Sequence, residues 1–126
     1  MTRMLLLAAL ALALPSAAMA DIGPKPTIAF NLKAGPDVRI AEGVLFECDN
    51  ARCATRTPLQ RLGPQGFGCK ARACSGQAYG FSEYVELQLT FADGRRLTSP
   101  PIAKTDFDES FDVAIRDGRL KVTPAR

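Results

Sequence analysis

The residues from Tyr84 to Phe91 alternate strictly between apolar and polar side chains, with Val85, Leu87 and Leu89 on one face. A repeat of two residues places successive side chains on opposite faces of a β-strand, whereas a helix would need a longer repeat. One face of such a strand is typically buried and the other meets water. No segment after residue 20 sustains a helical period. The pattern therefore predicts an all-β fold.

Shorter alternating segments flank this strand and are separated by turn signals. They cover Thr27–Leu32, Val38–Cys48, Arg96–Thr98, Asp112–Arg116 and Leu120–Val122. Asp-Gly pairs at 93–94 and 117–118 predict hairpin turns, and Gly43 predicts a bulge or a bend. We expect about seven short strands in a small antiparallel β-sandwich with immunoglobulin-like proportions and loops pinned by disulfides.

The first twenty residues have the pattern of a secretory signal peptide. Arg3 precedes an unbroken apolar run from Met4 to Leu14, and the small-x-small sequence ending at Ala20 matches a signal peptidase site. A membrane anchor is the alternative, but spanning a bilayer takes about 20 apolar residues. We expect cleavage before Asp21, which removes 20 of the 126 residues and leaves one domain of 106 without a membrane span. That domain is expected in the periplasm or outside the cell.

Four cysteines form two units with four residues between the paired positions, Cys48 with Cys53 and Cys69 with Cys74. An even count in an exported chain predicts disulfides. We favour the two local pairings because each spacer suits a tight turn, and Gly66–Tyr79 is expected to form an irregular hairpin. The nested pairing would close longer loops and stays open. A zinc site with four cysteine ligands is disfavoured, since zinc-binding pairs are usually closer in sequence.

The composition excludes several classes of function. The chain has no histidine, so Ser-His-Asp and Cys-His catalysis and the commonest metal ligand are absent. We expect no enzyme, no metal and no cofactor. The formal charge is +3, which falls to +2 when Arg3 is removed, so neither nucleic-acid nor membrane binding is expected.

Basic and aromatic side chains gather around the cysteines, and no acid lies between Asp49 and Glu83. The candidate binding residues are Arg52, Arg56, Arg61, Lys70, Arg72, Phe67 and Tyr79. Loops held by disulfides lose little entropy on binding, and Arg and Tyr make strong anchors. The alternative is a set of solvated charges that keeps a β protein soluble. The expected partner is an envelope protein or an anionic polymer, bound by a monomer.

An acidic segment runs from Asp106 to Asp112, with Asp108 and Glu109 between them. Four carboxylates in seven residues could bind Ca²⁺, but the spacing is not that of an EF-hand. We instead expect an acidic loop that Phe107 and Phe111 fasten to the core. A carboxylate-based enzyme would need a cleft, which a short-looped sandwich of this size hardly offers.

The opening Asp21-Ile-Gly-Pro-Lys-Pro26, followed by Thr27-Ile-Ala-Phe30, resembles a group of uncharacterised exported bacterial proteins. Their mature chains open D-I-G-P-K-P and continue into an alternating β segment. Residues 62–65, 78–80 and 91–94 are compatible with the same group. The resemblance implies an extracytoplasmic β domain and carries no activity, so it transfers no functional residue.

These observations favour a non-catalytic binding or accessory domain of the cell envelope. The Arg-bearing cysteine loops would meet the partner, so replacing Arg52, Arg61 and Arg72 together is expected to weaken capture without lowering the melting temperature. The alternative is a small secreted enzyme inhibitor that presents one disulfide-pinned basic loop to its target.

Overall fold

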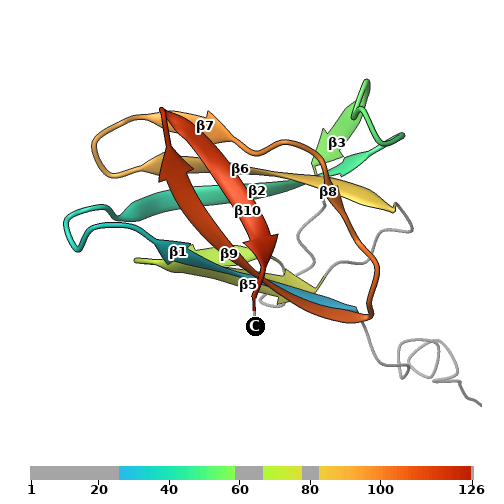
Figure 1. Cartoon of the computed structure of the whole chain (residues 1–126), viewed down its shortest axis with the longest axis horizontal. Coiled ribbons are helices and arrows are strands. Elements are labelled where there is room, and N and C mark those ends of the chain that lie inside the picture. The colour runs from blue at the N-terminus through green and yellow to red at the C-terminus, as the bar shows by residue number, and fades with distance from the viewer. Residues whose placement is uncertain (1–25, 59–66, 78–82, 126) are drawn as a thin grey trace, which may run out of the picture.

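The chain folds as a sandwich of two β-sheets (Figure 1). The computed structural model describes residues 26–58, 67–77 and 83–125, and this part of the chain contains ten strands and no helix. The predicted all-β sandwich is confirmed. The strand count exceeds the expected seven because several strands have only two or three residues, too few to show an alternating pattern.

Sheet A contains five strands, of which β1 is central. In spatial order they are β10 (Arg119–Pro124), β9 (Asp108–Arg116), β1 (Thr27–Lys33), β5 (Ala73–Gln77) and β4 (Gly68–Lys70). The pairing is antiparallel except between β1 and β9, which run parallel with Thr27 opposite Asp108. A parallel pair joins two distant segments and leaves no hairpin signal between them, so the alternation alone did not predict it.

Sheet B is built around β2 and β6. Its path is β3 (Arg56–Pro58), β2 (Ile40–Cys48), β6 (Tyr84–Phe91) and β7 (Arg96–Thr98), while β8 (Ile102–Ala103) also pairs with β6. The pairing of β2 with β6 shifts register between Ile40 and Glu42, so the bulge lies close to the glycine that predicted it. Strands β6 and β7 have the bounds that the sequence predicted.

Both predicted Asp-Gly hairpins are present. Gly94 and Gly118 have φ values of 94° and 72°, a region that glycine enters without steric cost. In the first turn the Arg95 backbone N–H donates to the Asp93 carboxylate at 2.9 Å. This hydrogen bond, with the Arg95 guanidinium beside it, lowers the pKa of Asp93.

The core lies between the sheets and is formed by the alternating apolar residues. From sheet B it receives the inward face of β6, and from sheet A the aromatic side chains of Phe30 and Phe111. The Phe30 ring stacks on Phe111 at 5.5 Å between centroids and meets Phe67 edge-on at 6.0 Å. Aromatic pairs in these geometries add stability beyond the area they bury.

The two disulfides are local, as expected. Cys48 bonds to Cys53 at the end of β2, and Cys69 bonds to Cys74 across the β4–β5 hairpin. All four cysteines are thereby oxidised, so the nested pairing and the zinc site are both excluded. No helix in the described ranges is long and apolar enough to cross a bilayer. The predicted signal peptide lies outside the described residues.

Gly43 brings the two sheets together against the second disulfide. A Cβ atom placed on this residue would lie 2.3 Å from Cys69 Sγ and 3.2 Å from Cys74 Sγ. No real side chain tolerates such a distance, so β2 can approach the β4–β5 hairpin closely only with glycine here. The bulge beside Gly43 and the disulfide beneath it are therefore parts of one close contact.

We predict that Gly43→Ala lowers the free energy of unfolding by about 1–3 kcal/mol, as overpacking in a core does. Urea denaturation of the oxidised protein measures the effect. Gly35→Ala is the matched control, because a Cβ there has no atom within 4 Å. The loss of unfolding free energy caused by Gly43→Ala should be smaller when Cys69 and Cys74 are both replaced by alanine. An equal loss with and without the disulfide would contradict the proposed contact.

Candidate functional site

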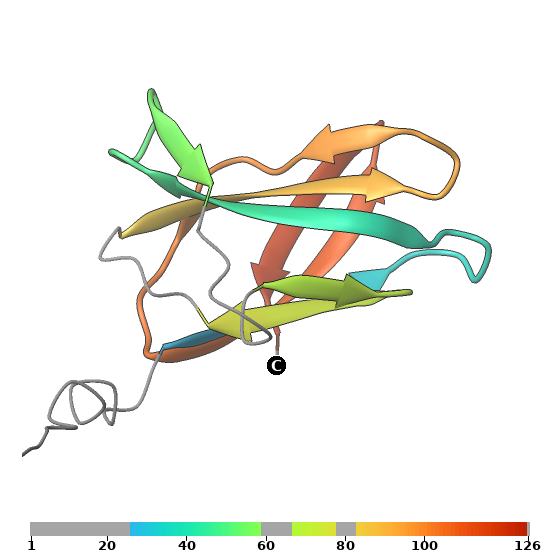
Figure 2. The same cartoon turned by 180° about the vertical axis from the view of Figure 1, so that it is seen from behind.

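The structure separates the two cysteine turns that the sequence analysis grouped into one surface. The Cys48–Cys53 loop follows the last residue of β2. The β4–β5 turn lies beside the first residue of β2, where the Ile40 N–H donates to the Ala71 carbonyl at 2.7 Å. Strand β2 has nine residues, so these points are roughly 25 Å apart. Figure 2 shows β3 and the β4–β5 turn toward opposite ends of the molecule.

Arg72 serves the fold at one of these ends. Its guanidinium donates to the carbonyls of Gly35 at 2.7 Å and Val38 at 3.1 Å, and also to that of Ala34. The Arg72 carbonyl accepts from the Leu32 N–H at 2.8 Å. A planar guanidinium with five donors suits three converging carbonyls. Arg72 thus holds the β1–β2 loop in place, which a binding role would not require.

Arg56 has two partners on the outer face of sheet B. Its guanidinium lies 3.0 Å from the Glu86 carboxylate and 4.1 Å from the centroid of the Phe46 ring. The Cys48–Cys53 disulfide lies beside Glu86. This group could not bind a metal through sulfur, since both cysteines are oxidised.

The remaining predicted binding residues differ in exposure and in position. Phe67 is only 5 % exposed and packs in the core, so it offers no surface for a ligand. Arg52 and Lys70 are exposed, one in the first cysteine loop and the other on β4. Arg61 and Tyr79 lie outside the described residues. The predicted cations in the described ranges are therefore split between the two ends of β2, with Arg52 and Arg56 at one end and Lys70 and Arg72 at the other.

The acidic segment does not form a common cation site. Asp108 accepts from the Thr27 hydroxyl at 2.7 Å, and Asp112 lies 3.9 Å from the Lys33 ammonium. Glu109 accepts from the Thr105 N–H at 2.9 Å. By the two-residue alternation of β9, Asp108 and Asp112 share one face and Glu109 lies on the other, and each carboxylate has its own partner. Phe111 does enter the core, but Phe107 is 50 % exposed and does not fasten the loop as expected.

One further carboxylate faces inward on sheet B. Glu47 lies opposite Val85 in the β2–β6 pairing, and its Oε1 is buried. Within the described ranges this oxygen has no hydrogen-bond partner.

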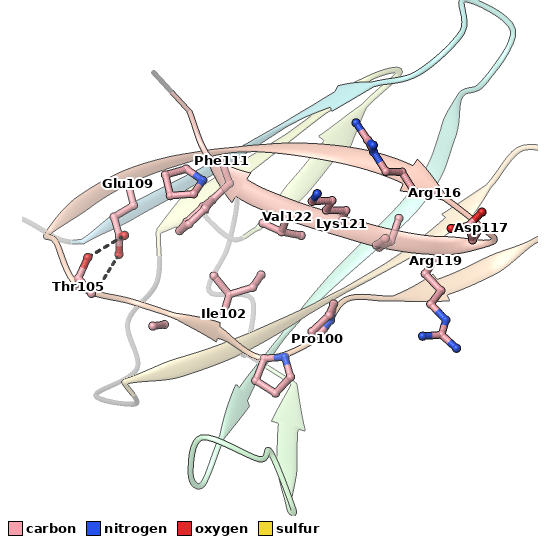
Figure 3. Close-up of a pocket in the computed structure, with 14 residues that line it drawn as sticks. Pro100, Ile102, Thr105, Glu109, Phe111, Arg116, Asp117, Arg119, Lys121 and Val122 are labelled. Carbon is pink, nitrogen blue, oxygen red and sulfur yellow. Dashed lines mark hydrogen bonds between the residues drawn. The ribbon is translucent and has the colours of Figure 1, made fainter.

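A groove of about 700 Å³ runs along one side of the sandwich, between β10 and the connection from β7 to β9 (Figure 3). Buried apolar side chains form its floor, namely Ile102 from β8, Phe111 from β9 and Leu120 from β10. The partly buried Val122 lies beside them. An apolar floor of this size, open to solvent, is what a bound segment of another molecule would cover.

Hydrogen bonds fix the wall of the groove formed by residues 100–105. At one end, buried Ser99 donates its backbone N–H to the Leu87 carbonyl at 2.8 Å, and its hydroxyl accepts from the Leu87 N–H at 2.9 Å. At the other end, the Lys104 N–H donates to the Glu83 carbonyl at 2.7 Å. The wall is therefore held at one end to β6 and at the other to Glu83, the residue before β6, so the position of this wall does not depend on a ligand.

The rim of the groove carries a concentration of positive charge. Arg116, Arg119 and Lys121 line it and are exposed, and within the described ranges none of them forms an ion pair. Asp117 lies at the same end, while Glu109 is at the far end and bonded to Thr105 (Figure 3). The unneutralised cations favour an anionic partner.

No local sequence pattern predicts this groove. One signal was available, because residues 113–126 contain four basic side chains and one acid. The opposing wall comes from a proline-rich connection whose position depends on tertiary packing, so the groove itself had no local signature.

We predict that Arg72→Ala lowers the free energy of unfolding by about 1–3 kcal/mol, because it leaves loop carbonyls without their donor. Arg72→Lys should recover part of this stability, since lysine keeps the positive charge but lacks the planar, forked guanidinium. Lys70→Ala, at an exposed neighbouring site, is the control and should be neutral. The measurement is urea denaturation together with the melting temperature. If Arg72→Ala instead melts at the wild-type temperature, the Arg72 guanidinium does not support the fold and is available to bind a partner.

Comparisons with known proteins identify the fold and nothing more specific. No protein-family model matches the chain, and no curated protein matches it. A solved structure, titled "NMR structure of the protein from Eubacterium rectale", matches 84 % of this chain and 93 % of its own, with a TM-score of 0.53 and 11 % sequence identity. The chain therefore shares a two-sheet β architecture with that protein.

Proposed function

We propose that residues 21–126 form a non-catalytic binding domain of the bacterial cell envelope, and that the groove beside β10 is its binding site. The observation that carries the proposal is an apolar floor bordered by three cations without ion-pair partners in the described ranges. A folded domain gains little stability from such an arrangement, whereas a partner with an apolar and acidic surface would satisfy both parts.

Export is supported by two independent features. The first twenty residues have the order of charge, apolar run and small residues that signal peptidase recognises. The two disulfides join the only four cysteines of the chain, and such bonds persist in oxidising compartments. A binding role is favoured over catalysis because the chain has no histidine, and the carboxylates of β9 are bonded to separate partners.

The test places a photoreactive amino acid at Lys121, on the groove, or at Lys70, on the opposite edge of sheet A. In an exporting host we expect covalent adducts from position 121 and few from position 70. Arg116→Glu combined with Arg119→Glu should remove the adducts, because the charge of the rim is reversed. Equal adducts from both positions, or none from either, would contradict the proposed site.

The same preparations test the compartment by intact mass. We expect a chain that begins at Asp21 and lies about four mass units below its all-thiol form, since each disulfide removes two hydrogens. A chain beginning at Met1, or one with free thiols, would contradict export.

A second candidate function is supported by the Cys48–Cys53 loop. Arg52 is exposed in this loop, and the Asn50 carboxamide accepts from its backbone N–H at 3.0 Å. Asp49 accepts from the Thr55 N–H at 3.0 Å, so hydrogen bonds and a disulfide both order the loop. A rigid loop presenting arginine has the form of an inhibitor of proteases that cleave after basic residues.

If this second function holds, the oxidised domain should inhibit an arginine-specific serine protease stoichiometrically. Arg52→Ala should abolish inhibition without changing the melting temperature, while Arg56→Ala, outside the disulfide loop, should retain it. Inhibition that survives Arg52→Ala, or rapid cleavage after Arg52, would exclude the inhibitor.

A further inference from the structure

The groove is bordered by a free strand edge from each sheet. In the described part of the chain, β10 has β9 as its single strand neighbour and ends sheet A. Across the groove, β8 pairs with β6 and with no other described strand. The open side of the sandwich therefore presents the unpaired backbone groups of β10 above the apolar floor, whereas the opposite wall has only the two residues of β8 and begins with Pro100 and Pro101, which lack an N–H.

The register shows which backbone groups of β10 face the groove. The β9–β10 hairpin closes with Arg116 opposite Arg119 around a two-residue turn, and the Ala125 N–H donates to the Ser110 carbonyl. In an antiparallel pair, hydrogen-bonded positions alternate with positions that point away. Positions 119, 121, 123 and 125 therefore bond to β9, and the N–H and C=O groups of Leu120 and Val122 point to the free edge.

The side chains of β10 alternate between the two faces of sheet A. Leu120 and Val122 face the core, whereas Arg119 and Lys121 are exposed on the other side. A strand added beside β10 would place its own alternating residues in line with these two rows. Apolar residues would then cover the floor, and acidic residues would lie beside Arg119 and Lys121.

We propose that the groove binds an extended peptide segment of alternating apolar and acidic residues, which adds as a further strand to the free edge of β10. This inference rests on the proposed function and names the chemistry of the partner. Main-chain hydrogen bonds would supply affinity, and the floor and the rim would supply specificity, as in other cases of strand addition.

Charge favours an acidic partner over a second copy of this chain. Two β10 edges pairing with each other would bring Arg119 and Lys121 of one copy close to the same residues of the other. Like charges across neighbouring strands are destabilising. The described part of the chain also offers no acidic edge strand, because β3, β4, β7, β8 and β10 contain no aspartate or glutamate.

The experiment uses a short synthetic peptide that alternates glutamate and valine, with both ends blocked, and measures its affinity for the oxidised domain by fluorescence anisotropy. When such a peptide pairs antiparallel to β10, its valine residues on the same face as Leu120 and Val122 direct their N–H groups to β10. Methylating the valine nitrogens should weaken binding about tenfold or more, since each blocked bond is worth about a factor of five. Methylating the glutamate nitrogens instead keeps the bonds to β10 and is the matched control.

Variants of the protein test the same contacts from the other side. Arg119→Ala combined with Lys121→Ala should weaken binding severalfold, with an effect that diminishes as salt is raised. Lys33→Ala combined with Lys70→Ala removes equal charge from other strands of sheet A and should leave affinity unchanged. Val122→Pro removes one outward N–H without breaking the bonds to β9, so it should weaken binding while hydrogen–deuterium exchange of the hairpin stays at its wild-type rate.

Other outcomes would overturn the inference in distinguishable ways. The groove would be an electrostatic patch for polyanions if the position of N-methylation did not change peptide affinity and polyphosphate bound equally well. Photocrosslinks from position 121 without peptide binding would refute the peptide chemistry and leave the proposed function standing. Absence of both would refute the two proposals together. A dimer in sedimentation that Val122→Pro dissociates would identify a second copy as the occupant of the edge.

Discussion

Strand β1 holds sheet A together, because its two neighbours come from distant parts of the chain. It pairs with β5 on one side and, in parallel, with β9 on the other. Its side chains also carry the centre of the core, since the Phe30 ring contacts both Phe67 and Phe111. The parallel register places β9, the hairpin then places β10, and the position of β10 defines the open side of the sandwich. The groove is thus a consequence of one long-range pairing.

How far the sequence predicts this structure depends on the range of the interactions involved. The bounds of β6 and β7, the two Asp-Gly hairpins and the local disulfides follow from neighbouring residues, and each was predicted. The parallel pairing and the groove join segments without a shared turn, so no local pattern encodes them. Phe67 shows why local patterns are insufficient. An aromatic residue among glycines and cations predicts an exposed side chain, whereas packing against Phe30 buries it.

The cations show why composition alone could not locate a binding site. Arg72 and Arg56 looked like free surface charges in the sequence, but the first binds three loop carbonyls and the second lies between Glu86 and a phenyl ring. Both therefore contribute to the folded state. The groove cations have no such partner within the described ranges, and this distinction between satisfied and unsatisfied charge exists only in three dimensions.

The edge of β10 carries features that β proteins use against unwanted pairing, since Arg119 and Lys121 charge it and Pro124 ends it. These features repel another copy of the same edge, but they do not repel every strand. A segment with acidic residues in register would meet favourable charges and a line of free backbone groups above an apolar floor. Protection against self-association and selection of an acidic partner are therefore compatible, because both follow from the sign of the charge on one row of side chains.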